Sequence, residues 1–121
     1  MTIRKFLIPV ALLLALVLSA YADITGKWTA EFDTQIGAQK YTYEFKADAG
    51  KLTGTATGPQ GSVAIQEGKV DGDTVFFVEN MTYQGMEIRI EYSGKLAGDE
   101  LKLTRKVGEF ATEELVAKRV K

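Results

Sequence analysis

Apolar and polar residues alternate along most of this 121-residue chain. In the stretch 40–47, which reads KYTYEFKA, every second residue is apolar, and 27–32 and 86–92 repeat the pattern. A period of two places successive side chains on opposite faces of a β-strand, so that one face is buried and the other meets water. After residue 22 no segment has a convincing helical period, and 113–121 is the one most compatible with a helix. The sequence therefore predicts an all-β fold.

Turn signals separate the alternating runs at intervals of about 8 to 13 residues, which is typical of hairpins in series. They are Asp48-Ala49-Gly50, Gly58-Pro59-Gln60-Gly61, Asp71-Gly72-Asp73, Gln84-Gly85 and Ala97-Gly98-Asp99. The strands expected between them are about 25–33, 39–47, 51–58, 62–70, 74–82, 86–95, 100–107 and 111–120. Because an open series of hairpins leaves exposed edges, we expect a single eight-stranded antiparallel up-and-down (meander) β-barrel.

One ten-residue phrase occurs twice, as GKVDGDTVFF at 68–77 and as GKLAGDELKL at 94–103. Each copy predicts a hairpin whose central glycine adopts a positive φ in the turn. A calcium loop at Asp71 and Asp73 is the alternative interpretation. Calcium needs about six to eight oxygen ligands, and the second copy replaces Asp71 by Ala97, so we expect turn chemistry and no metal.

The first 22 residues have the organisation of a secretory signal peptide. Arg4 and Lys5 precede an apolar run at 6–18, and Ser19-Ala20-Tyr21-Ala22 provides an A-x-A cleavage site. The apolar run is shorter than the roughly 20 residues that a membrane-spanning helix needs. We therefore expect cleavage after Ala22, a single β-barrel domain at 23–121, no transmembrane segment after cleavage, and export to the periplasm or the extracellular space.

Composition excludes several classes of function. The chain has no histidine and no cysteine, so Ser-His-Asp, Cys-His and ordinary zinc sites cannot be built. Without Arg4 and Lys5 the chain has 13 basic and 16 acidic residues, a net charge of −3, and no long basic cluster that would bind nucleic acid. Carboxylate, lysine, tyrosine or arginine chemistry remains, but no residue set assigns it. We expect a non-enzymatic protein without a cofactor.

Gly26-Lys27-Trp28 opens the first expected strand, and Arg119 lies near the end of the last one. This pair resembles the signature of the calycin superfamily, which includes lipocalins, fatty-acid-binding proteins and avidins. The resemblance implies structural roles for Gly26, Trp28 and Arg119, with the arginine cation lying on the indole and plugging one end of the barrel. The chain is far shorter than a lipocalin and lacks room for its flanking helix, so it is most similar to small bacterial export proteins with a minimal calycin-like barrel.

Aligning the two copies of the repeat predicts two charges inside the barrel. Val75, Phe77 and Glu79 take the places of Leu101, Leu103 and Arg105. If the apolar residues point inward, Glu79 and Arg105 do so as well. Burying these charges costs free energy unless they are paired or lie near water. Either they lie at the open mouth, solvated or paired with each other, or they orient a ligand in an apolar pocket, with Arg105 matched to a carboxylate.

An eight-stranded barrel is just wide enough to be filled by side chains or to hold one small ligand. The small residues Gly54 and Ala56 either open a pocket beside Tyr41 and Tyr43 or merely accommodate their bulk. The candidate ligand-binding residues are Tyr41, Tyr43, Phe77, Glu79, Met86, Ile88 and Arg105. We expect a secreted binding protein for a small apolar or amphipathic ligand. The alternative is a carbohydrate-associated or cell-envelope interaction module, with a filled barrel whose loops contact glycan or protein.

Overall fold

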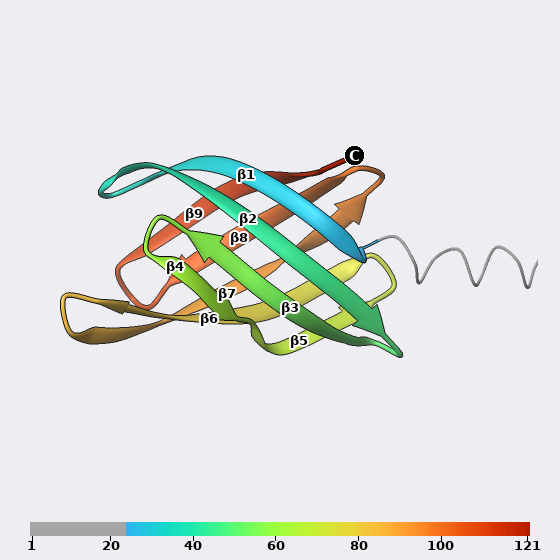
Figure 1. Cartoon of the computed structure of the whole chain (residues 1–121), viewed down its shortest axis with the longest axis horizontal. Coiled ribbons are helices and arrows are strands. Elements are labelled where there is room, and N and C mark those ends of the chain that lie inside the picture. The colour runs from blue at the N-terminus through green and yellow to red at the C-terminus, as the bar shows by residue number, and fades with distance from the viewer. Residues whose placement is uncertain (1–23) are drawn as a thin grey trace, which may run out of the picture.

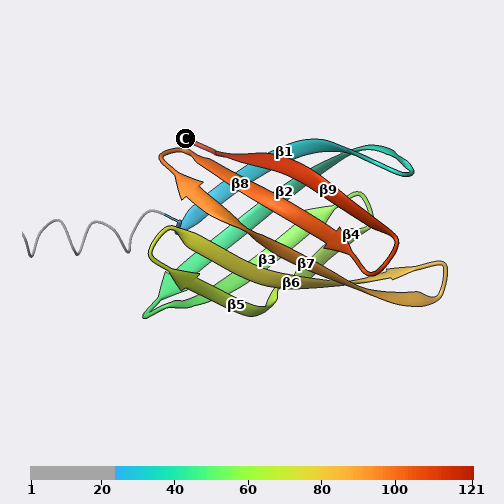
Figure 2. The same ribbon diagram turned by 180° about the vertical axis from the view of Figure 1, so that it is seen from behind.

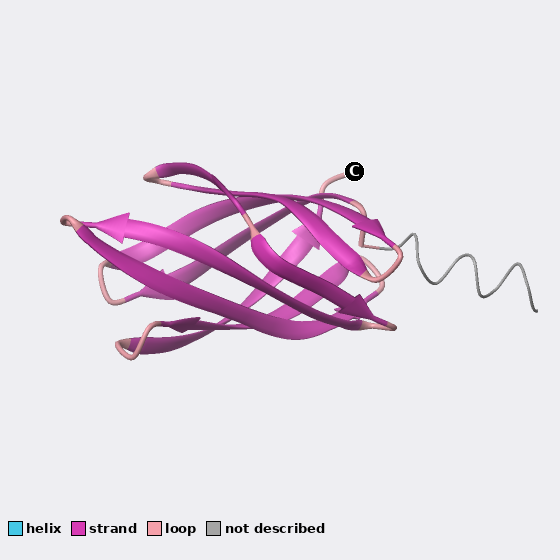
Figure 3. Ribbon diagram, turned by 90° about the horizontal axis from the view of Figure 1, so that it is seen from below, coloured by secondary structure: helices cyan, strands magenta, loops and turns pink. Residues whose placement is uncertain are grey.

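The computed structural model describes residues 24–121, and every regular element within them is a β-strand (Figure 1, Figure 3). The strands are β1 (Gly26–Thr34), β2 (Gly37–Asp48), β3 (Lys51–Gly58), β4 (Gly61–Ala64), β5 (Gln66–Asp71), β6 (Thr74–Tyr83), β7 (Met86–Ala97), β8 (Glu100–Val107) and β9 (Ala111–Arg119). The expected signal peptide and its cleavage site lie outside the described residues.

The sheet closes on itself. All neighbouring strands are antiparallel, and β1 pairs with β9 on one side and with β2 on the other. The pairing of β2 with β3 completes the ring β1-β2-β3-β5-β6-β7-β8-β9, while β4 is an extra strand on β3. The predicted all-β, eight-stranded meander barrel is therefore confirmed, and the segment 113–121 belongs mainly to a strand, not to a helix.

The prediction of one continuous strand at 62–70 is wrong. Ile65 interrupts it, so that β4 pairs with β3 and β5 crosses to pair with β6. The register shifts between Gln66 and Lys69, and Glu67 has a φ of 55°. A bulge of this kind adds a residue and bends the strand, which reverses the inside-outside alternation that sequence patterning relies on.

The repeated phrase forms the β5–β6 and β7–β8 hairpins, with φ values of 61° at Gly72 and 64° at Gly98. The first glycine of each copy has a structural role of its own, which the sequence did not reveal. A Cβ atom on Gly68 would lie 2.0 Å from the Leu52 carbonyl oxygen, and one on Gly94 would lie 1.8 Å from the Lys102 carbonyl oxygen. These glycines mark points where a neighbouring backbone approaches too closely for any side chain.

The turns gather at the two ends of the barrel (Figure 1, Figure 2), and the two sets of turns differ in charge. We call one end the closed end; it holds Ile24, the chain's C-terminus and the turns at 48–51, 71–74 and 97–100, each of which contains an aspartate. The opposite end, the mouth, holds the turns at 34–37, 58–61, 83–86 and 107–111. Glu109 is the one charged residue in these four turns. The turns of the mouth are thus much less charged than those of the closed end.

The closed end is plugged by the single tryptophan of the chain. Trp28 is fully buried, and its Nε1 donates a hydrogen bond of 2.9 Å to the carbonyl oxygen of Ile24. The guanidinium carbon of Arg119 lies 4.4 Å from the centroid of the Trp28 ring. The same arginine donates to the Thr25 carbonyl oxygen at 3.2 Å and to the Asp99 carboxylate at 3.1 Å. The cation covers the indole and connects the end of β9 to the residue before β1 and to the β7–β8 turn.

Aromatic rings fill the middle of the barrel. Tyr43 stacks on Phe45 with centroids 5.7 Å apart, and Phe77 stacks on Tyr92 with centroids 4.4 Å apart. The two pairs meet edge to face, with 5.2 Å between the centroids of Phe45 and Phe77. Leu101, together with all four rings, is buried. Because this packing leaves little free space, any sizeable cavity must lie nearer the mouth.

Candidate functional site

A cavity of about 280 Å³ opens at the mouth of the barrel. Most of its wall is apolar and comes from Ile36, Pro59, Met81, Tyr83, Met86, Ile88, Val107, Phe110 and Ala111. Thr34 and the side-chain amides of Gln35, Gln39, Gln60 and Gln84 add uncharged polar groups. Tyr41 and Arg105 are buried, the Glu113 side chain is 10% exposed, and these three residues form the base of the cavity.

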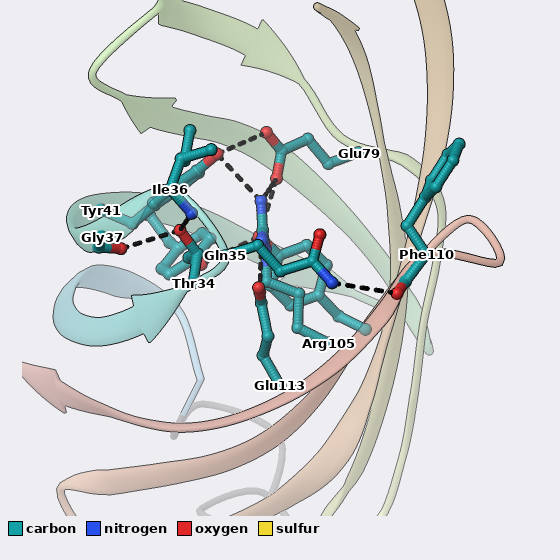
Figure 4. Close-up of polar contacts among 11 residues, drawn as sticks. Thr34, Gln35, Ile36, Gly37, Tyr41, Glu79, Arg105, Phe110 and Glu113 are labelled. Carbon is teal, nitrogen blue, oxygen red and sulfur yellow. Dashed lines mark hydrogen bonds and ion pairs between the residues drawn. The ribbon is translucent and has the colours of Figure 1, made fainter.

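Arg105 is the centre of a hydrogen-bonded network at this base (Figure 4). Its Nη1 donates to Glu113 at 2.6 Å, its Nε to the Tyr92 hydroxyl at 2.8 Å, and its Nη2 to the Tyr41 hydroxyl at 3.1 Å. Its Nη2 also lies 3.8 Å from the Glu79 carboxylate. The cation therefore contacts two carboxylates and two phenols, all supplied by the barrel itself.

Glu79 is satisfied by the same phenols. The Tyr41 hydroxyl donates to Oε2 at 3.0 Å, and the Tyr92 hydroxyl donates to Oε1 at 2.7 Å. The Tyr43 hydroxyl in turn donates to the Tyr92 oxygen at 3.1 Å. Within residues 24–121, no buried side-chain nitrogen or oxygen lacks a hydrogen-bond partner. Each buried charge is thus compensated inside the fold, as buried ionic groups require.

The surroundings of the three buried phenols and of Arg105 determine their protonation states. Burial raises the pKa of Tyr43 and of Tyr92 well above the usual value for a phenol, and burial together with the Glu79 charge does the same for Tyr41. Burial alone would lower the pKa of Arg105, but the facing phenol oxygens and the bond to Glu113 raise it above its ordinary value. The phenols therefore remain hydrogen-bond donors, and Arg105 remains a cation, at neutral pH.

The candidate residues from the sequence fall into two groups. Tyr41, Met86, Ile88 and Arg105 line the cavity. Tyr43 and Phe77 lie below it in the filled part of the barrel, and Glu79 lies behind Tyr41 and Arg105 outside the lining. All of these side chains except Met86 and Ile88 are buried.

Glu79 and Arg105 point inward, with exposed fractions of 4% and 3%. The expectation that water solvates these two charges at the mouth is therefore wrong. The alternative, that they pair with each other, is observed. The small residues of β3 do not open the cavity. Ala56 is buried directly opposite Tyr43 in the strand register, where it accommodates the ring.

The sequence-based candidates did not include most of the lining residues, among them Glu113, Gln35 and Phe110. Glu113 lies directly opposite Arg105 in the β8–β9 register, and counting back from the β8–β9 turn could have found it. Gln35 donates from Nε2 to the Phe110 carbonyl oxygen at 3.2 Å and thereby connects two neighbouring turns at the rim of the mouth (Figure 4). These turn residues carry no periodic signal, so alternation could not have indicated them.

Comparison of the chain with protein-family models, with curated proteins and with solved structures finds no match. Among residues 24–121, no cluster of three or more acidic side chains is placed to hold a metal ion. The same residues contain no helix long and apolar enough to cross a membrane.

Proposed function

We propose that this protein is a secreted, non-enzymatic carrier that binds one small amphipathic molecule in the mouth cavity. The observation that carries the proposal is the cavity itself, which combines an apolar wall with a few polar groups at its base. Pockets for small molecules generally have this composition, because apolar contacts supply affinity and the polar groups fix orientation. Since aromatic rings fill the barrel below, the ligand is a short molecule held near the opening.

The calycin-like assignment is part of the same proposal. It is supported by the closed meander barrel and by the Arg119 cation over Trp28 at the closed end. The signal-peptide pattern supports export to the periplasm or the extracellular space. The ion pairs of Arg105 with Glu79 and Glu113, and the bonds of Arg105 and Glu79 to phenols, hold these side chains in place and so suit a fixed binding surface.

Contact with the cell envelope through the rim is a second candidate function. Ile36, Met86 and Phe110 lie in mouth turns with 61%, 55% and 60% of their surface exposed. Exposed apolar side chains that gather at one end of a molecule are typical of a contact site. Co-sedimentation with cell-wall polysaccharide or lipid vesicles tests this candidate, and Phe110→Ser should reduce any pelleting that is observed.

A neutral fluorescent probe such as Nile red tests the carrier function. The folded protein should enhance its emission, and Ile88→Trp should abolish the enhancement because the larger ring fills the cavity that Ile88 lines. Val116→Trp is the matched control, since Val116 is exposed and lies outside the cavity lining. Circular dichroism checks that both variants are folded. Equal probe binding by the two folded variants would rule out the mouth cavity as the ligand site.

A further inference from the structure

The base of the mouth cavity carries an excess of negative charge. Arg105 supplies one positive charge, whereas Glu79 and Glu113 supply two negative charges within 4 Å of it. Their side chains are between 4% and 10% exposed, so water screens them poorly. Among the described residues that line the cavity, Arg105 and Glu113 are the only charged ones. The base therefore has a net charge of about −1, with no lining residue to offset it.

Arg105 has little capacity left for a ligand. Each of its three nitrogens already donates to a protein oxygen, on Tyr92, Glu113 or Tyr41. Three of its five N–H hydrogens are used in this way, and Nη2 also lies 3.8 Å from Glu79. A ligand carboxylate on the remaining N–H groups would place a third negative charge close to Glu79 and Glu113, which is unfavourable in a poorly hydrated site. The hypothesis that Arg105 selects a carboxylate therefore conflicts with the observed contacts.

Glu113, in contrast, has an unused acceptor. Its Oε1 accepts the bond from Arg105, and no group among residues 24–121 donates to its Oε2. Because no buried side-chain oxygen in this part of the chain lacks a partner, Oε2 is accessible, and Glu113 lines the cavity. An ionised carboxylate only accepts hydrogen bonds. The hydroxyl hydrogens of Tyr41 and Tyr92 are already directed at Glu79, so the base offers an acceptor and no free phenol donor.

We infer that the cavity selects an amphipathic molecule whose polar end is a protonated amine. The ammonium group donates to Glu113 Oε2 and neutralises the excess charge at the base, while the apolar body lies against Ile88, Val107 and Phe110. A neutral alcohol satisfies the hydrogen bond but not the charge. This inference rests on the proposed carrier function, because it names the class of ligand for the same cavity.

Competition among octylamine, octanol and octanoate for the Nile red site tests the inference at neutral pH. The three compounds share one apolar chain and differ in the charge of the polar end. We expect octylamine to displace the probe at the lowest concentration and octanoate at the highest, with each step about tenfold or more, which corresponds to about 1.4 kcal/mol. Glu113→Gln should remove most of the preference for octylamine over octanol. Glu114→Gln is the matched control, because Glu114 is exposed and bonds to Thr104 on β8.

The outcomes separate the two levels of the proposal. Displacement by octanoate at the lowest concentration would overturn the ligand class and leave the carrier function intact. An unchanged amine preference in the folded Glu113→Gln variant would overturn the role of Glu113. If the wild-type protein binds neither the probe nor any of the three compounds, the carrier function itself fails. Should Glu113→Gln not fold, the order of the three compounds on the wild-type protein still decides the charge preference.

Discussion

Replacement of Arg105 by methionine should destabilise the barrel strongly. Methionine keeps most of the length of the side chain but removes the cation that contacts Glu79 and Glu113. Glu79, which is 4% exposed, would remain as a buried charge without its counter-ion. Breaking a buried ion pair from one side costs about 3 to 5 kcal/mol. That loss is a large part of the roughly 5 to 15 kcal/mol that stabilises a typical domain.

Arg89 provides a matched control. It also makes two short ion pairs, at 2.6 Å to Glu67 and 3.0 Å to Glu91, but its side chain is 47% exposed. Exposed pairs contribute only about 0 to 1 kcal/mol. Urea unfolding followed by circular dichroism should therefore show a midpoint lower by roughly 2 M for Arg105→Met, at a typical denaturant dependence of about 2 kcal/mol per M. Arg89→Met should shift it by less than about 0.5 M.

A second substitution isolates the cause of the loss. Glu79→Gln in the Arg105→Met background removes the uncompensated carboxylate, so the double variant should be more stable than Arg105→Met alone. Equal losses for Arg105→Met and Arg89→Met would refute the argument, because burial would then not decide the strength of these ion pairs. A double variant less stable than the single one would refute the assignment of the cost to Glu79.

Three further predictions concern the packing and the phenols. Trp28→Ala should lower the free energy of unfolding by about 3 to 5 kcal/mol. Nile red binding by the folded variant should be unchanged, because Trp28 does not line the cavity. An unaltered melting temperature would contradict the role of Trp28 as the plug of the closed end. Gly94→Ala should cost about 3 kcal/mol in urea unfolding, since the added Cβ meets the Lys102 carbonyl oxygen. That cost should exceed the cost of Gly85→Ala, where the added atom meets open space and only the φ of 78° disfavours a side chain. Alkaline pH should destabilise the protein, because the raised pKa values of Tyr43 and Tyr92 keep both phenols protonated when folded, whereas the unfolded chain loses these protons near pH 10. Full stability is present below about pH 10 and then falls by about 1.4 kcal/mol per pH unit for each tyrosine, so a flat stability profile between about pH 10 and 11.5 would count against their burial.

Period-two patterning was sufficient to predict the barrel because it assigns each residue to one face of a strand. Transferring that assignment from one copy of the repeat to the other placed Glu79 and Arg105 inside the barrel, where the structure has them. Alternation breaks where a bulge intervenes, and the interruption at Ile65 therefore could not be predicted from it.

The depth of a residue along the barrel axis was the second property that the sequence pattern could not predict. Tyr41 and Tyr43 share one face of β2 and look equivalent in the sequence, yet Tyr41 lines the cavity and Tyr43 lies in the filled part below it. The level at which the packing ends depends on how side chains from several strands fit together, and no single strand encodes it. Glu113 could have been predicted from the sequence, because it shares the inward face of Leu115 and lies opposite Arg105 in one hairpin.

The position of Trp28 also determines how the molecule can be observed by light. It is the single tryptophan of the chain, sealed under Arg119 at the closed end and absent from the cavity lining. Its fluorescence should therefore change when the barrel opens and stay constant when the mouth is occupied. Tyr41 and Tyr83 line the cavity, so tyrosine ultraviolet absorption should respond to an occupant. The chain carries one optical reporter for folding and another for occupancy, and a labelled variant is not needed to tell these events apart.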